Sequence, residues 1–439
     1  MVEARSRGGA TPTSRVLWIL LLAYIFNFVD RQIIGILAVP IKADLALSDT
    51  QLGLMGGLAF ALFYTGLGIP IAWVADRWSR VNIIAAAVAV WSGFTALCGF
   101  AQNFWHLFLA RMGVGVGEAG GVAPSYSLIA DYFPPTRRAR ALAIFSFGIP
   151  IGSALGIFFG GWIATHVDWR TAFIVVGLLG LPVALLVKLG IKEPVRGGYD
   201  RAEGTEPEPA PPFSLVAATL AKKPSFWLLS FGAASGSILG YGLIFWLPSF
   251  FRRSFDLELA QVGWFYGSIV LIGGVIGTWL GGWLGDRIGA RNPGAYALVP
   301  AICFLLAAPA YALGLFAPSL ALGWLLFVIP QALGLAWLGP IIAAVQHIVP
   351  PTMRATASAS FLFINNLIGI GFGTWFVGFM SDSVAPIYGD DSLRYSILYT
   401  LGFYLLSSAL YFAASFTLKK DWHSNAPAEA SREGVEGVV

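Results

Sequence analysis

Long apolar stretches are the feature that most restricts how this 439-residue chain can fold. A helix needs roughly 20 apolar residues to cross the hydrocarbon layer of a bilayer, and it satisfies its own backbone polar groups there. Only 11% of the residues are charged, whereas soluble domains carry roughly 25%. We therefore predict an all-α membrane protein with twelve transmembrane helices. They are expected near residues 16–41, 50–75, 82–102, 104–131, 138–163, 169–189, 224–250, 260–284, 294–316, 320–346, 354–380 and 393–418.

The distribution of lysine and arginine predicts which ends of these helices face the cytoplasm. With the N-terminus placed inside, 20 of the 27 basic residues fall in inside segments, 5 fall in outside segments and 2 fall within helices. Basic residues favour the cytoplasmic side, so both termini are predicted to be cytoplasmic. The first apolar run lacks a small-residue cleavage site and should be retained as a helix. We expect a multi-pass protein of a cell membrane, the bacterial inner membrane in particular.

The two halves of the chain repeat one another. PPTRRARA at 134–141 matches PPTMRATA at 350–357 over most positions, an offset of 216 residues, and the same offset places Pro124 on Pro340. Internal repeats of this kind predict an architecture of two pseudosymmetric six-helix bundles, with a substrate site at the membrane midplane between them.

Domain boundaries follow from this repeat and from composition. A charged segment rich in Pro and Gly, EPVRGGYDRAEGTEPEPAPP, lies near the middle of the chain and is typical of a flexible linker. The predicted parts are a cytoplasmic N-terminus (1–15), an N-terminal bundle (16–190), a cytoplasmic linker (191–222), a C-terminal bundle (223–418) and a cytoplasmic tail (419–439).

Several motifs resemble those of a known family. GGWLGDRIGAR (281–291) strongly resembles the signature between helices 2 and 3 of the major facilitator superfamily, and AWVADRWSR (72–80) is a degenerate copy. NFVDRQIIGIL in the first helix and RMGVGVGEAG in the fourth resemble the Spinster family. The resemblance implies twelve helices, alternating access, and an amphipathic anionic substrate of the lysophospholipid or sphingoid-phosphate type. Organic-anion and sugar-acid symporters share part of the motif set, so a small organic acid or sugar is an alternative substrate.

Four charges lie well inside predicted helices: Asp30, Arg31, Arg111 and Glu118. A charge at mid-bilayer costs at least a few kcal/mol, so each must be paired or face water. Their formal sum is zero, and all four lie in the first half. A structural ion-pair cluster is one interpretation; a transport site is the one we favour.

Helical geometry divides these charges. Successive residues point about 100° apart, so Asp30 and Arg31 do not share a face, whereas Tyr24, Asn27 and Arg31 form one polar stripe. We predict that this stripe binds substrate together with Arg111 and Glu118. Arginine does not release its proton in practice and binds phosphate or carboxylate bidentately. A carboxyl group can titrate, because burial and a neighbouring guanidinium move its pKa in opposite directions, so Asp30 is the predicted proton-coupling residue. The Spinster resemblance supports the Asp30 and Glu118 assignments.

Other polar residues of the predicted helices are candidates either for a substrate cavity or for hydrogen bonds between packed helices. They are Ser235, Ser237, Tyr241, Gln331, Asn365 and Asn366.

Two acid–base pairs at helix ends are candidate gates. The superfamily resemblance implies that Asp76–Arg77 and Asp286–Arg287 close the cytoplasmic side in the outward-open state. Asp76 is expected to meet the start of the eleventh helix, and Arg77 to meet Asp131. The position equivalent to Asp131 in the second half is His347, which predicts a weaker or pH-responsive gate there. Ordinary topology and snorkelling are the alternative explanation for these charges.

Other function classes receive no support from the sequence. There is no phosphate-cradling loop, no metal-ligand spacing among four scattered histidines, and no nucleophile–base pair, so we expect neither enzymatic activity nor a cofactor or metal. We expect no nucleic-acid partner, a monomer, and contacts with membrane lipids, protons and a small amphipathic anion. A receptor or uncoupled lipid scramblase on the same fold is a further alternative.

Overall fold

The computed structural model describes residues 13–75, 77–196, 211–284, 287 and 292–423, and its regular elements there are all helical. The first half contains α1 (Thr13–Ile36), α2 (Ala38–Leu45), α3 (Asp49–Gly56), α4 (Leu58–Ala75), α5 (Arg80–Cys98), α6 (Phe104–Glu118), α7 (Val122–Tyr132), α8 (Pro135–Ser146), α9 (Gly148–His166) and α10 (Trp169–Gly190). The second half contains α11 (Phe213–Ala221), α12 (Pro224–Ser254), α13 (Leu259–Leu284), α14 (Ala295–Leu315), α15 (Leu320–Leu335), α16 (Leu338–His347), α17 (Arg354–Tyr388), α18 (Ser392–Thr400) and α19 (Gly402–Asp421). Short 3-10 turns flank α17 at Pro351–Met353 and Gly389–Asp391.

Ten segments of the described residues are long and apolar enough to cross a membrane. One of them, Thr356–Asp421, contains both α17 and the α18–α19 pair, and the α6–α7 pair is not among the ten. The all-helical membrane architecture is confirmed, while the count of twelve crossings stays a prediction.

Prolines explain why several predicted helices appear as two consecutive pieces. A proline ring clashes with the carbonyl four residues earlier and removes one helical hydrogen bond. Each of four prolines is the third residue of the helix that follows such an interruption: Pro40 in α2, Pro124 in α7, Pro150 in α9 and Pro340 in α16. The second and fourth of these breaks are equivalent under the 216-residue repeat, so the two halves share this irregularity.

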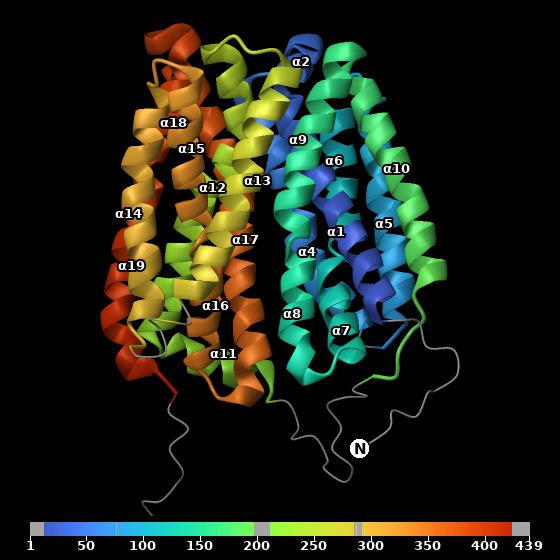
Figure 1. Ribbon diagram of the computed structural model, residues 1–439, viewed down its shortest axis with the longest axis vertical. Coiled ribbons are helices and arrows are strands. Elements are labelled where there is room, and N and C mark those ends of the chain that lie inside the picture. Colours follow the sequence, from blue (N-terminus) through green and yellow to red (C-terminus); the bar gives the residue numbers. More distant parts are fainter. Residues whose placement is uncertain (1–12, 76, 197–210, 285–286, 288–291, 424–439) are drawn as a thin grey trace, which may run out of the picture.

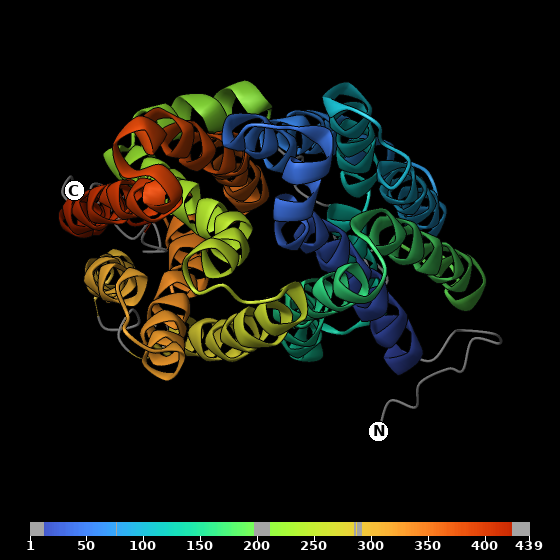
Figure 2. The same ribbon diagram turned by 90° about the horizontal axis from the view of Figure 1, so that it is seen from above.

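The two halves lie side by side (Figures 1 and 2) and pack against each other chiefly through α9 with α13, α3 and α4 with α17, and α1 with α12. Glycines permit this close packing. A Cβ on Gly53 would come within 2.4 Å of the Thr374 carbonyl oxygen, and one on Gly161 within 2.4 Å of the Leu259 carbonyl oxygen. Both positions lie toward the end of the molecule formed by α2 and α3, which is the predicted periplasmic end.

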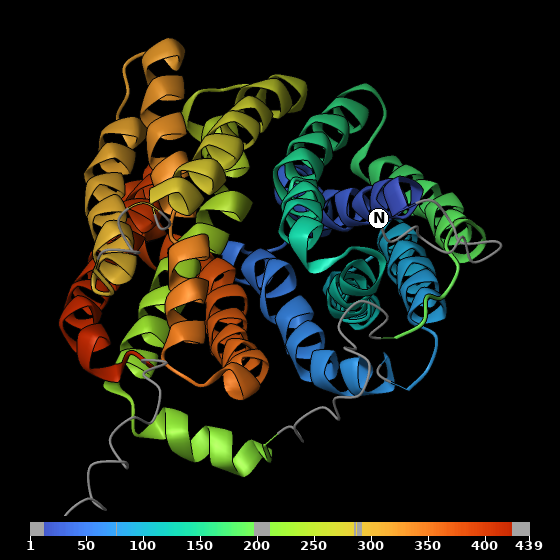
Figure 3. The same cartoon turned by 60° about the horizontal axis from the view of Figure 1, so that its bottom comes forward.

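The predicted cytoplasmic linker, residues 191–222, contains ordered structure at both of its described ends. Ile191 is buried, and the Lys192 carbonyl accepts a hydrogen bond from the Tyr132 hydroxyl. At the other end α11 packs on α12 and α17 through buried Val216 and Leu220 (Figure 3).

Candidate functional site

Arg31 of α1 and Glu118 at the end of α6 form an ion pair in the N-terminal half. The Arg31 Nε lies 2.6 Å from a Glu118 carboxylate oxygen, and the two side chains are 12% and 0% exposed. The guanidinium also lies over three aromatic rings, with its Cζ 5.1, 4.9 and 4.5 Å from the ring centres of Phe28, Phe60 and Tyr64. Arg31 is thus held by one carboxylate and an aromatic wall, and it retains some access to solvent.

Asp30 points into the bundle, away from this pair, as the helical repeat predicts. It is 1% exposed, and its electrostatic neighbours include Glu118, Arg111 of α6, and the Thr95 and Trp91 side chains of α5. Arg111, also 1% exposed, donates to the main-chain carbonyl of Asp30 at 3.5 Å. The structure therefore brings the four predicted charges into one neighbourhood, with Arg111 in its interior and Arg31 at its edge.

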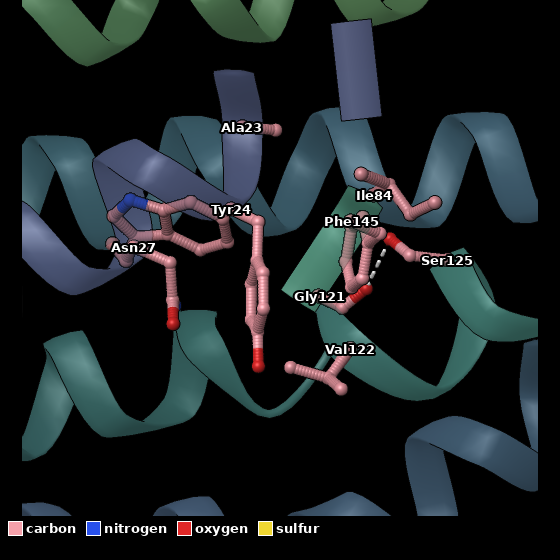
Figure 4. Close-up of a pocket in the computed structure, with 9 residues that line it drawn as sticks. Ala23, Tyr24, Asn27, Ile84, Gly121, Val122, Ser125 and Phe145 are labelled. Atoms are coloured by element: carbon pink, nitrogen blue, oxygen red, sulfur yellow. Dashed lines mark hydrogen bonds between the residues drawn. The ribbon is translucent and has the colours of Figure 1, made fainter. Parts of the chain in front are cut away.

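Tyr24 and Asn27 lie beside a small cavity between α1, α5, α7 and α8 (Figure 4). The Tyr24 ring stacks on Phe145 with ring centres 4.3 Å apart. Asn27 is 2% exposed, and neither atom of its amide has a hydrogen-bond partner in the described part of the chain. In this conformation both side chains are buried between helices.

The C-terminal half has no counterpart of the Arg111–Glu118 pair. Phe327, equivalent to Arg111, is fully buried, with its ring centre 5.0 Å from that of Phe251. Polar side chains here bond to one another: Tyr311 donates to Gln331 at 3.0 Å, and Ser237 to Asn365 at 2.8 Å. These bonds favour the packing interpretation of the polar residues in this half.

A second charged site, which the sequence did not reveal, joins the two halves at the predicted periplasmic end. Asp49 of α3 is 2% exposed and accepts from both terminal nitrogens of Arg253 of α12, each at 2.7 Å. Its carboxylate also accepts from Lys42 at 2.7 Å and from the Ser381 hydroxyl at 2.8 Å. We call the ion pair of Asp49 with Arg253 the interhalf lock.

Asp382 of α17 reinforces the interhalf lock from the other half. Its carboxylate accepts from the Asp49 and Thr50 backbone N–H groups at 3.2 and 2.7 Å, and from the Thr50 hydroxyl at 2.6 Å. Carboxylates are favourable at helix N-termini, where backbone N–H groups lack partners. The sequence signals were weak, because Asp49 begins α3 and Arg253 lies in the last turn of α12, where charged residues are common.

The predicted cytoplasmic gate has a different set of partners. Arg80, not Arg77, donates to Asp131, at 2.5 Å, and its Nε lies 2.8 Å from a Glu193 oxygen. Arg77 is exposed and donates to the Trp73 carbonyl, so the predicted Arg77–Asp131 pair is not formed in this conformation, and its formation in the outward-open state stays a prediction. The start of α5 explains this choice of partner. Arg80 is the first residue of α5 and is buried in the bundle, whereas Arg77 lies in the preceding turn.

The other residues predicted for the cytoplasmic gates form no ion pair among the described residues. Arg287 lies with its Cζ 5.3 Å from the Trp283 ring centre. Asp76 and Asp286 lie outside the described residues. His347 stacks on Trp422 with ring centres 4.6 Å apart, as an interfacial histidine would.

Glu193, the other carboxylate beside Arg80, lies outside the apolar helices, and its surroundings change its pKa. Burial raises its pKa, but the Val81 backbone N–H and the Arg80 and Ser79 side chains lower it by more. The net pKa of Glu193 lies below its ordinary value of 4.5, so its negative charge stabilises the N-terminal half at neutral pH.

Metal and thiol chemistry receive no support from the described residues. No group of three or more His, Cys, Asp or Glu side chains among them is arranged to hold a metal ion. Cys98 and Cys303 are free and buried, as expected for packing residues.

Comparison with known proteins adds a family to this geometry. The family model of the Major Facilitator Superfamily matches residues 20–374. An MFS-type efflux pump of Mycolicibacterium smegmatis is 34% identical over 92% of this chain and 92% of its own length. Protein spinster homolog 1 of Homo sapiens is 30% identical over 85% of this chain and 74% of its own.

Two solved structures resemble the whole fold. Both are crystal structures of a bacterial homologue to the human lysosomal transporter Spinster. The inward-facing, unoccupied form has a TM-score of 0.86 at 35% identity, covering 95% of this chain and 100% of its own. The inward-facing, occupied form has a TM-score of 0.82 at 33% identity, covering 94% and 99%.

Proposed function

Because this chain belongs to the major facilitator superfamily and is a homologue of the Spinster transporters, we propose that it is a proton-coupled transporter of amphipathic anions. The proposed substrate is lipid-like, of the lysophospholipid or sphingoid-phosphate type, and it moves by alternating access. The family resemblance inferred from the motifs is thereby confirmed, whereas the substrate and the coupling ion are our proposal.

The Arg31–Glu118 pair carries this proposal. A guanidinium binds phosphate or carboxylate bidentately, and Arg31 is the predicted binding residue that retains solvent access. An entering anion would replace Glu118 as its partner, and the Phe28, Phe60 and Tyr64 rings would contact the apolar part next to the head group. The aromatic packing around Phe327 and Phe251 in the other half is consistent with an amphipathic substrate.

Asp30 is the proposed proton carrier. Its carboxyl is buried in a helix, one position from Arg31, so a movement of α1 displaces both groups together. Arg111 and Glu118 are close enough to change the relative stability of its charged and neutral forms. Substrate bound at Arg31 therefore alters the electrostatics at Asp30 through Glu118.

The proposed conformation is inward-facing. The interhalf lock holds the predicted periplasmic ends together, and the two solved relatives with this fold are inward-facing by their descriptions. Opening toward the periplasm then requires the interhalf lock to break, which makes it the natural counterpart of the cytoplasmic gate.

Transport in proteoliposomes tests the proposal. We expect saturable uptake of a radiolabelled lysophospholipid or sphingoid phosphate driven by an imposed pH gradient, lost in Asp30→Asn and strongly reduced in Arg31→Ala. Arg31→Lys keeps the charge without the bidentate geometry and should be intermediate. Uptake of sugar acids but not of lipids would overturn the proposed lipid-like substrate. Lipid movement that does not depend on the pH gradient would overturn proton coupling and indicate an uncoupled scramblase.

A further inference from the structure

A short amphipathic helix lies across the predicted cytoplasmic end of the C-terminal half. This helix, α11, is the last part of the predicted linker before α12, and it packs on α12 and α17 (Figures 1 and 3). Val216 and Leu220 are buried against the bundle, whereas Phe213 and Leu215 are 68% and 49% exposed. A short helix that also carries apolar side chains on its outer surface is typical of the interface between lipid and water.

An open hollow of about 390 Å³ lies between α11 and the end of α19. Its lining consists of Leu215, Ala218, Thr219, Lys222, Lys223 and Asp421. Leu215 and Ala218 give it an apolar side, and the two lysines give it a positively charged side. Apolar surface and positive charge therefore meet in one concave site, outside the helical bundles that hold Arg31 and Glu118.

The positive charge of this hollow exceeds the negative charge beside it. Lys223 donates to the main-chain carbonyl of Asp421 at 2.7 Å, while the Asp421 carboxylate accepts from the Ser225 backbone N–H at 3.0 Å, at the start of α12. The last turn of α19 adds two exposed lysines next to Asp421 in the chain. We call the hollow and its four neighbouring lysines the α11 patch; these lysines are Lys222, Lys223, Lys419 and Lys420.

Aromatic side chains at the start of α12 indicate the depth of the α11 patch in the membrane. Trp227 is 40% exposed, and its indole N–H donates to the Ala221 carbonyl of α11 at 3.3 Å. Phe231, one helical turn further along, is 45% exposed and stacks on Trp227 with ring centres 5.9 Å apart. Tryptophan is enriched where the headgroups of a membrane meet its hydrocarbon. The lysines therefore lie at headgroup depth, with an exposed apolar surface beginning beside them.

We propose that the α11 patch binds an anionic phospholipid of the cytoplasmic leaflet, with its phosphate at Lys222 and Lys223 and an acyl chain along Trp227 and Phe231. Lysine binds phosphate as a point charge, and basic pockets on the cytoplasmic side of membrane proteins bind anionic headgroups. A soluble anion would use the charge but leave the apolar surface unoccupied, which is why a lipid fits better. The bound lipid attaches the end of the linker to the membrane, and this inference depends on neither the transported substrate nor proton coupling.

Native mass spectrometry of the full-length protein in a neutral detergent measures the binding of added phosphatidylglycerol and phosphatidylcholine. We expect phosphatidylglycerol to bind roughly 30-fold more tightly, because each of the two lysines contributes a factor of about five toward an anionic headgroup. The double variant Lys222→Gln/Lys223→Gln removes both charges and should lose this preference. The matched control is Arg137→Gln/Arg140→Gln, which removes two exposed charges from the predicted cytoplasmic end of the other half and should keep the preference within about twofold.

Three results would overturn the α11 patch as a lipid site. The first is an equal loss of preference in the lysine and arginine double variants, which would show a general effect of surface charge.

The second is binding of the soluble headgroup glycerophosphoglycerol as tight as that of the lipid, which would show that the apolar surface takes no part. The third is loss of phosphatidylglycerol binding in Arg31→Ala but not in the lysine variant, which would place the lipid in the proposed substrate site. Binding that Arg31→Ala leaves unchanged supports the α11 patch, whatever the transport assay shows about the substrate and its coupling.

Discussion

Replacing Asp49 by asparagine should open the predicted periplasmic end of the molecule. The variant keeps the shape of the side chain but removes the charge that accepts two hydrogen bonds from Arg253 across the two halves. Lys42 belongs to the same half as Asp49, so its interaction persists whether or not the halves separate. The substitution therefore destabilises mainly the closed conformation, in which the two halves are joined.

The magnitude follows from burial. Asp49 is 2% exposed, whereas Arg253 is 20% exposed and can regain water when the halves part. Truncating one partner of a buried hydrogen-bonded charge pair costs 2–5 kcal/mol or more, and the partial exposure of Arg253 places this case near the lower end. A cost of about 2–3 kcal/mol shifts the closed-to-open ratio roughly 30- to 160-fold toward the open form.

Distances between spin labels measure this shift. Gln102→Cys and Glu258→Cys place labels on exposed loops of opposite halves at the same end, and the native Cys98 and Cys303 are buried. We expect a longer interlabel distance in Asp49→Asn. The matched control is Asp44→Asn, because Asp44 pairs with Arg170 within one half.

The result that refutes the reasoning is equally specific. If Asp49→Asn and Asp44→Asn give the same distance distribution as the parent protein, the interhalf lock does not hold the closed state. A shortened distance would show that Asp49 opposes closure.

Three further predictions concern single sites. Glu118→Gln leaves the Arg31 guanidinium without its carboxylate, so the protein should lose roughly 3 kcal/mol of stability; thermal unfolding followed by circular dichroism measures it, and an unchanged midpoint would contradict the pairing. Glu193→Gln should destabilise the protein at neutral pH, and because the folded pKa is lowered from 4.5 the difference from the parent should shrink as pH falls below 4.5; a difference that grows in acid would reverse the assigned sign. Gly53→Ala should favour the open periplasmic end in the spin-label assay, since its Cβ would meet a backbone carbonyl at 2.4 Å, whereas Gly68→Ala, which meets nothing within 4 Å, should not; equal behaviour of the two would show that the close approach does not limit closure.

Much of the candidate site was accessible from local sequence because it depends on one helix at a time. Charges in apolar runs must be paired or solvated whatever the fold, which selects Asp30, Arg31, Arg111 and Glu118. The angle between successive helical residues separates Asp30 from Arg31 without any tertiary information. The structure adds that Arg111 is buried beside Asp30 and that Arg31 takes Glu118 as its partner.

Contacts between distant segments were not accessible in this way. Asp49 and Arg253 are 204 residues apart, and Asp49 and Ser381 are 332 apart. Asp49 and Arg253 lie at helix ends, where a charge is ordinary, and Ser381 is one of several small polar residues within α17, so no local pattern marks them. The same reason explains why Arg80, and not Arg77, pairs with Asp131. The two arginines are alike in local sequence, and the position at which α5 begins decides which of them points toward Asp131.

The sequence by itself determined that the chain lies in a membrane, that it is helical, and that its two halves repeat one another. Apolar length, low charge and proline position are properties of consecutive residues, and the energetic cost of exposing backbone polar groups to lipid acts on each segment separately. Only the tertiary structure decided which charges meet and which residues join the two halves. Those outcomes depend on the close approach of helices hundreds of residues apart, where a few ångströms decide between an ion pair and two isolated charges.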